Sequence, residues 1–250
     1  MQYPIIRKLY KYREFDERNI KMLVDKQIWF SRPSDFNDPF DCNLVPALSK
    51  TEADRQQQVS KIIDRLYSPD KAQKAKQNLE ALDEFTSNET IEDKSLEAHF
   101  EEAKSMGVYS LSETPKQLLM WAHYASNHTG FCIEYAREDI KHNFLNHCMC
   151  RPVNYSLKYP NLNQELDTLG INIYTKSEDW EYEKEWRLVS KKDGLEIMPA
   201  PMTAIVFGLK MKAENKIHIV EKLLDNLDVK FYECVRVPDK FALEIVEYEI

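Results

Sequence analysis

Hydrophobic and polar residues alternate along several short segments of the chain, which is the pattern of strands that bury one face. The first such segment lies at 8–13 and precedes a helical pattern that Asp16 would cap and that runs to about Asp25. A second strand is expected at 27–31. The prolines and aspartates of the next segment, RPSDFNDPFD, favour turns over strands. The start of the chain therefore predicts strand, helix, strand and an ordered loop.

From 51 to 106 the chain changes to charged, glycine-free sequence in which apolar residues recur at helical spacing. Three amphipathic helices are expected there, with apolar stripes around Ile63, Ala72 and Phe100. We interpret this segment as a helical insertion within one domain that spans 1–250. Its stripes favour a packing arm, and a lid or an arm that binds a protein partner is the functional alternative.

After the insertion, 107–112 alternates like a strand, and Thr114 followed by Pro115 predicts the start of a helix that closes before Gly130. One further helix is expected near 213–226. The remaining strands are expected at GFCIEY, RPVNY, EWRLVS, TAIVFG, VKFYECVRV and LEIVEYEI. These elements predict an α+β fold with a mixed, largely antiparallel sheet as its core.

Composition removes several classes of function. The chain has 250 residues and a formal net charge of -8, so a chain-wide basic surface for duplex nucleic acid is absent, although a local basic patch stays open. With five glycines it lacks the phosphate-binding and nucleophile motifs of P-loop, Rossmann and α/β-hydrolase proteins. The start of the sequence has no apolar leader, and no apolar run approaches a membrane span of about 20 residues. We expect a cytoplasmic protein without membrane contact, with reduced thiols.

The segment DWEYEKEWRL, at 179–188, carries the strongest chemical signal. It places Glu183 and Glu185 among bulky aromatic residues, where a charged group loses much of its hydration. In a strand, residues two apart share one face, so both carboxylates would point the same way. One interpretation is an active site. The other is an ion-paired strand, because Arg187 would share the face of the two glutamates.

The succession LYKYR, IWFSRPSDFNDPFD, YSLS, LLMWAHYASNHTGFCIEY and YEKEWRL resembles a large, mostly bacterial family, domain-of-unknown-function family 2971. Relatives in that family occur near phage-defence and abortive-infection genes. The order of elements is also similar to that of ADP-ribosyltransferases. Those enzymes carry a His or Arg on a first strand, a Ser/Thr on a middle strand and a Gln/Glu-x-Glu motif near the end.

This second resemblance implies NAD as a substrate and a set of site residues. The matching positions are Lys11 or Arg13 for the cation, Ser110 or Ser112 for the middle strand, and Glu183-Lys184-Glu185 for the last motif. Glu185 would stabilise the oxocarbenium-like ribose that forms when nicotinamide leaves, and Glu183 would orient or deprotonate the acceptor. The implied protein is a phage-defence or toxin effector that modifies an unknown macromolecular acceptor.

The helix that precedes Gly130 adds two candidates for contact with the cofactor, Trp121 and His123. A helical histidine beside large apolar residues is more often a core residue, so both rank below Glu185. The aromatic residues beside the two glutamates, Trp180, Tyr182 and Trp186, could sandwich the nicotinamide or adenine ring.

Two rival functions remain open. The first is a metal-dependent nuclease or other hydrolase that uses Asp38, Asp41, His123 and a glutamate, although NDPFD is more typical of an Asx-turn. The second is a sensor or interaction module without catalysis, in which the helices of 51–106 bind a partner. The segment HCMC with His142 offers nitrogen and sulfur atoms for zinc, but its spacing favours buried structural thiols, and no metal site is predicted.

Overall fold

The computed structural model describes residues 6–43, 60, 63–64, 67–83, 105–140, 150–159, 168–224 and 228–249. Within the predicted insertion 51–106, the described part contains the helix α3 (Pro69–Asp83). The other two predicted helices fall largely outside the described residues, as do His142, His147 and Cys148. The division into one domain with an insertion therefore stays a prediction.

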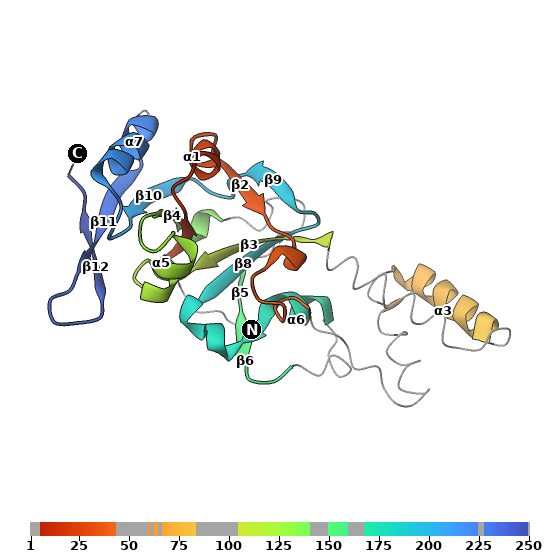
Figure 1. Cartoon of the computed structure of the whole chain (residues 1–250). Coiled ribbons are helices and arrows are strands. Elements are labelled where there is room, and N and C mark those ends of the chain that lie inside the picture. The colour runs from red at the N-terminus through yellow and green to blue at the C-terminus, as the bar shows by residue number, and fades with distance from the viewer. Residues whose placement is uncertain are drawn as a thin grey trace.

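A sheet of eight strands forms the centre of the molecule (Figure 1), and its spatial order is β12-β11-β10-β4-β1-β3-β8-β5. The strands in chain order are β1 (Lys8–Arg13), β3 (Gly107–Ser112), β4 (Phe131–Ala136), β5 (Arg151–Pro152), β8 (Glu185–Ser190), β10 (Met202–Phe207), β11 (Lys230–Arg236) and β12 (Leu243–Glu247). The β10–β11 pair is parallel and the other pairs in this sheet are antiparallel. The predicted α+β fold with a largely antiparallel sheet is confirmed.

Two small sheets flank the large one. The first pairs β2 (Gln27–Phe30) with β9 (Gly194–Ile197), and the second pairs β6 (Asn154–Ser156) in parallel with β7 (Thr175–Ser177). Besides α3, the described helices are α1 (Glu17–Val24), α5 (Leu118–Tyr124), α6 (Thr168–Tyr174) and α7 (Ala213–Leu223). The short 3-10 turns are η1 (Pro33–Asp35), η2 (Arg137–Asp139) and η5 (Glu178–Glu183). The described residues contain no helix that is long and apolar enough to cross a membrane.

Apolar side chains cover both faces of the large sheet. Along β4 successive residues enter different core clusters, because neighbouring side chains of a strand point to opposite faces. Phe131 and Ile133 pack in the cluster that includes α1 and α7, whereas Cys132 packs with Trp121 of α5. Helices therefore cover the sheet from both sides, and the site described below lies where β1, β3 and β8 meet the loops.

Local signals placed some element ends correctly and others wrongly. The predicted cap of α1 is confirmed, because the Asp16 side chain accepts a hydrogen bond from the backbone of Asn19. The predicted start at Pro115 is wrong, since α5 begins at Leu118. Thr114 Oγ1 instead accepts from the backbone N–H of Lys116 at 3.1 Å, which closes a turn before the helix.

The predicted single strand RPVNY is also wrong, because the segment changes partner in its middle. Its first two residues form β5 and pair with β8, and its last two belong to β6, which pairs with β7. Between them the N–H of Val153 donates to the carbonyl of Glu185 at 2.8 Å. The segment therefore links the large sheet to a small one, beside the Glu183–Glu185 motif.

Candidate functional site

A cavity of about 690 Å³ opens where β1, β3 and β8 lie next to each other. The register places Ser112 opposite both Tyr10 of β1 and Glu185 of β8. Seven of the eight residues proposed from the sequence for an NAD site line this cavity: Lys11, Arg13, Ser110, Ser112, His123, Glu183 and Glu185. Three segments that are distant in the sequence are therefore brought to one site. The volume lies within the range of about 300–1,000 Å³ that is usual for small-molecule sites.

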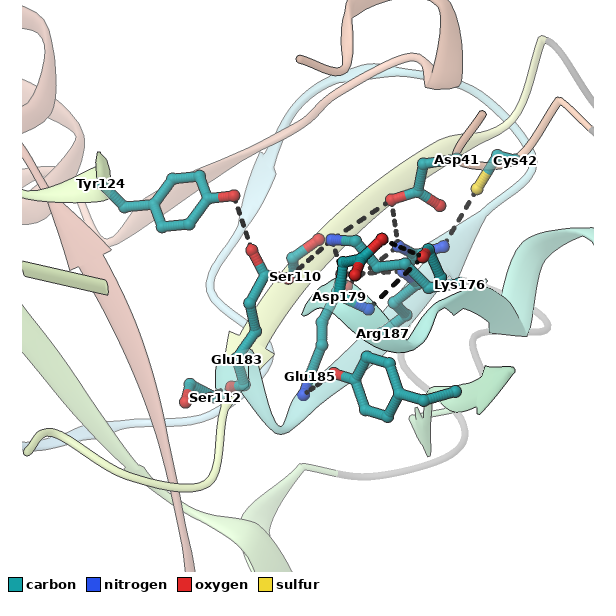
Figure 2. A network of polar contacts seen from close by, with 12 residues as sticks. Asp41, Cys42, Ser110, Ser112, Tyr124, Lys176, Asp179, Glu183, Glu185 and Arg187 are labelled. Carbon is teal, nitrogen blue, oxygen red and sulfur yellow. Dashed lines mark hydrogen bonds and ion pairs between the residues drawn. The ribbon is translucent and has the colours of Figure 1, made fainter. Parts of the chain in front are cut away.

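Arg187 is the central cation of the site, and its side chain is completely buried. Its Nε and one Nη donate hydrogen bonds to the two carboxylate oxygens of Glu185 at 2.7 and 2.9 Å (Figure 2). The same Nη also donates to Asp41 Oδ2 at 2.6 Å. The other Nη donates to the carbonyl of Ile173 at 2.5 Å and to Cys42 Sγ at 3.1 Å. All five N–H groups of the guanidinium have acceptors, so burial leaves none of them unsatisfied.

Lys176 of β7 is a second buried cation, and it joins three carboxylates. Its Nζ lies 2.6 Å from Glu183, 3.1 Å from Glu185 and 3.3 Å from Asp41. Figure 2 shows these side chains converging from the loop after β2, from β7, from the 3-10 turn η5 and from β8. Together with Arg187 they form a set that we call the ion network: Asp41, Lys176, Glu183, Glu185 and Arg187.

The pKa values of the two glutamates are shifted in opposite directions within the ion network. Burial would raise the pKa of Glu185, but the charges of Arg187 and Lys176 outweigh it and hold this pKa well below its usual range. Burial raises the pKa of Glu183 above its ordinary value, with Lys176 opposing the shift and the charge of Glu185 adding to it. Glu185 is thus the carboxylate that stays ionised, whereas Glu183 is the one better able to hold a proton.

The two glutamates do not lie on one strand, which corrects the sequence interpretation. Glu183 ends the 3-10 turn η5, and Glu185 begins β8. Between them Lys184 has a left-handed backbone with φ 45°, so the chain turns sharply there. Both carboxylates nevertheless reach Lys176, because tertiary contacts position them. Tyr124 OH donates to Glu183 at 2.6 Å, and Ser112 Oγ donates to the Glu183 carbonyl at 2.7 Å.

Lys11 and Arg13 bring cations of β1 to the same cavity. Lys11 Nζ donates to the Ser110 carbonyl at 2.8 Å and lies 4.7 Å from the centre of the Tyr109 ring, while the Arg13 guanidinium lies 5.7 Å from that ring. Burial, and then the charge of Arg13, lower the pKa of Lys11 to about 7. An anion bound between these two side chains would offset the charge of Arg13 and favour the protonated amine.

The remaining candidates have different surroundings. His123 is exposed and lies near the Tyr124 and Tyr182 rings, with ring centres 6.2 and 6.5 Å away. Trp121 does not line the cavity, because it is fully buried and its Nε1 donates to the Pro115 carbonyl at 2.7 Å. Trp186, expected to stand near the cofactor, is also a core residue whose Nε1 donates to Glu113.

Sequence reasoning missed Lys176 altogether and linked Asp41 only with metal binding. A single lysine in the short strand TKS has no local feature that marks it as buried. Asp38 and Asp41 fall within one turn, but Asp38 accepts the backbone N–H of Phe40 at 2.9 Å, as the Asx-turn interpretation expects. Asp41 binds the two cations of the ion network instead. Among the described residues, no three His, Cys, Asp or Glu side chains are grouped to hold a metal ion.

The fold and site define an α+β protein whose cavity combines cations on β1 with a buried ion network from β7, η5, β8 and the loop after β2. Residues 120–188 match the model of the family described as "Protein of unknown function (DUF2971)". The match begins in α5 and ends in β8, so it includes His123, the two glutamates and the cations of the ion network. No curated protein and no solved structure matches the chain.

Proposed function

We propose that the protein is an ADP-ribosyltransferase-like enzyme that cleaves NAD at the cavity between β1, β3 and β8. The observation that carries this proposal is the meeting of the three motif positions, on neighbouring strands, around one cavity. The resemblance in sequence predicted the order of these positions along the chain. Their convergence in space is an independent requirement of a shared active site.

The charges of the cavity match the two kinds of charge that NAD carries. Lys11 and Arg13 offer cations for the pyrophosphate. The ion network holds three carboxylates against two cations, so its ionised form has an excess negative charge that favours the positive nicotinamide ring. Asp41 Oδ1 is buried and has no hydrogen-bond partner in the described structure, so it can accept a hydrogen bond from a ribose hydroxyl.

The acidity of the two glutamates assigns their roles. In the reaction the bond between nicotinamide nitrogen and ribose C1′ breaks, and nicotinamide leaves with the electron pair. The positive charge that develops on the ribose is stabilised by Glu185, which Arg187 and Lys176 keep ionised. The acceptor then forms a bond to C1′ and releases a proton, which Glu183 takes because its raised pKa makes it the stronger base.

Transfer of label from adenine-labelled NAD into the protein and nucleic-acid fractions of a bacterial lysate tests the proposal. The wild type should transfer label, and Glu185→Gln should lower the rate by at least about a hundredfold, the usual loss when one electrostatic stabiliser is removed. Glu134→Gln is the matched control. Glu134 is also buried and paired with a lysine, Lys8, on the same sheet, but it does not line the cavity. Thermal melts should show that both variants are folded.

Three outcomes would contradict the proposal. Folded wild type that releases no nicotinamide and transfers no label would exclude NAD cleavage under these conditions. Equal activity of the wild type and Glu185→Gln would remove the assigned role. If Glu185→Gln is much less stable than the wild type and the wild type shows no turnover, the sensor or interaction module is favoured.

Thermal melting with Mg²⁺ in place of NAD tests the metal-dependent alternative, because a ligand that binds only the folded state raises the melting midpoint. A role in phage defence or as a toxin rests on the resemblance alone.

A further inference from the structure

A second hollow of about 460 Å³ adjoins the main cavity, and the two share Asn37 and Lys176. We call it the aromatic groove. One wall comes from the loop 37–40 after β2, and the other comes from the ends of β6 and β7, where Ser156 pairs with Ser177. No role in the proposed reaction has been assigned to this groove.

Large apolar side chains are exposed along the aromatic groove. Phe40 is 63% exposed, Tyr159 58% and Leu157 79%. The Phe40 and Tyr159 rings lie together, with their centres 6.3 Å apart and their planes tilted by 49°. Trp180 adds a third aromatic ring to the lining. Single exposed apolar residues are common, but several gathered in one hollow mark an interaction site.

Charged side chains of both signs line the groove, and the excess of negative charge comes from the ion network beside it. Asp38 and Asp179 line it, against Lys158 and the buried Lys176. Lys176 is already bound to three carboxylates of the ion network, which contains more carboxylates than cations. The lining itself is thus balanced, with two carboxylates and two lysines, and the ion network behind Lys176 adds three carboxylates and Arg187. With the network fully ionised, groove and network together hold five carboxylates and three cations, in a chain that carries -8. This balance repels a phosphodiester backbone and attracts a cationic side chain.

We propose that the aromatic groove docks a basic segment of a protein partner, with cationic side chains flanked by apolar residues. Aromatic faces and carboxylates are the two groups that attract ammonium and guanidinium ions. Phe40, Tyr159 and Trp180 supply the faces, and Asp38 and Asp179 supply the carboxylates. Since the groove adjoins the main cavity, such a segment would be held beside the reacting ribose. That consequence rests on the proposed function, whereas docking itself needs no NAD.

Selection from a display library of random short peptides, carried out on the whole protein without NAD, tests the docking proposal. The wild type should enrich peptides that combine Arg or Lys with apolar residues. The Phe40→Ala/Tyr159→Ala double variant should bind the selected peptides about tenfold more weakly, which corresponds to two cation–aromatic contacts. The Asp38→Asn/Asp179→Asn variant should weaken binding in the same direction. Both aromatic residues are exposed, so their removal should leave the fold intact.

Phe241→Ala is the matched control, because Phe241 is fully exposed between β11 and β12 and does not line the groove. Its removal should leave peptide binding unchanged.

Enriched peptides that are acidic, or that bind the double variant as well as the wild type, would overturn the proposal, and so would failure to enrich any peptide. Binding of a single-stranded oligonucleotide that depends on Phe40 and Tyr159 would overturn it in favour of nucleic acid. NAD cleavage without peptide binding would contradict the docking proposal alone. Peptide binding without NAD cleavage would contradict the enzymatic proposal alone.

Discussion

At the scale of single residues, burial and pairing decide what each charged group can do. Arg187 and Glu185 are both buried, yet each is held charged because every donor and acceptor has a partner. Lys11 loses hydration on burial and lies beside the cation Arg13, so its amine loses its proton easily. The same sheet thus holds one carboxylate locked in its ionised form and one amine that titrates near neutrality.

The titration of Lys11 predicts how the binding of an anionic ligand depends on pH. Only the protonated amine attracts a phosphate, and the lowered pKa of about 7 means that this form is lost as pH rises through neutrality. The affinity for NAD should therefore be highest below pH 7 and fall above it, approaching about tenfold per pH unit for one linked proton. Calorimetric titration of the wild type between pH 6 and pH 8, values about one unit on either side of that pKa, measures this slope.

Lys11→Arg is the matching variant, because arginine stays charged throughout this range. Its affinity for NAD should be independent of pH between the same limits. A slope that is unchanged in Lys11→Arg would assign the titration to another group. A flat profile in the wild type would show that Lys11 does not contact the ligand.

At the scale of elements, the turn between α5 and β4 shows how a loop can set the position of a strand. Ser126, Asn127 and His128 all have positive φ, and Gly130 follows them immediately before β4. A Cβ on Gly130 would lie 2.1 Å from the Arg13 carbonyl and 3.0 Å from the Ala125 carbonyl. Both are backbone atoms, so they cannot move aside as a flexible side chain would. The absence of a side chain at Gly130 lets α5, β4 and the end of β1 approach closely.

Gly130→Ala should therefore force β1 and β4 apart near Arg13. We expect a loss of unfolding free energy of about 1–3 kcal/mol, the usual cost of overpacking, together with weaker NAD binding from the displaced β1. Urea unfolding and calorimetry measure the two effects. Thr129→Ala, at an exposed neighbouring position, should change both by much less. Equal stability of Gly130→Ala and the wild type would show that the turn has room to relax.

At the scale of the whole molecule, the ion network ties separate parts of the chain together. Asp41 belongs to the loop after β2, Lys176 to the small β6–β7 sheet and Glu185 to the large sheet. Their contacts thus join three separate units of the fold, and those of Asp41 link parts of the chain that are far apart in the sequence. The cost of taking these charges out of water is offset only while every partner is present.

Removing one cation should expose how much the molecule depends on this network. Lys176→Met leaves Asp41 and Glu185 with Arg187 as their cation, and leaves Glu183 with the Tyr124 hydroxyl but without the cation that it binds. We expect a loss of about 3–5 kcal/mol in unfolding free energy. Lys21→Met breaks the exposed pair with Asp25 and should cost no more than about 0.5 kcal/mol. Urea unfolding of both variants at neutral pH makes the comparison. If both variants lose similarly little unfolding free energy, the buried carboxylates of Lys176→Met take up protons or water and the fold stays intact.

The sequence by itself determined the type and order of most described elements. Alternation and short apolar runs marked β1, β3, β4 and β8 as strands, and Asp16 marked the start of α1 because a cap acts within one turn. It also marked Glu185 through an improbable local setting, charge among aromatic residues. These signals depend only on residues that are close in the sequence, so the sequence alone reveals them.

Only the tertiary structure decided which distant groups meet. Lys176 pairs with carboxylates on other elements, and Asp41 reaches Arg187 from a different part of the chain, so no local spacing records either contact. The left-handed turn at Lys184 and the late start of α5 at Leu118 likewise depend on packing and hydrogen bonds that outweigh local preference. The site is assembled from three strands and a loop, and tertiary contacts set the pairing and the pKa values of its charged groups. These properties therefore exist only in the folded chain.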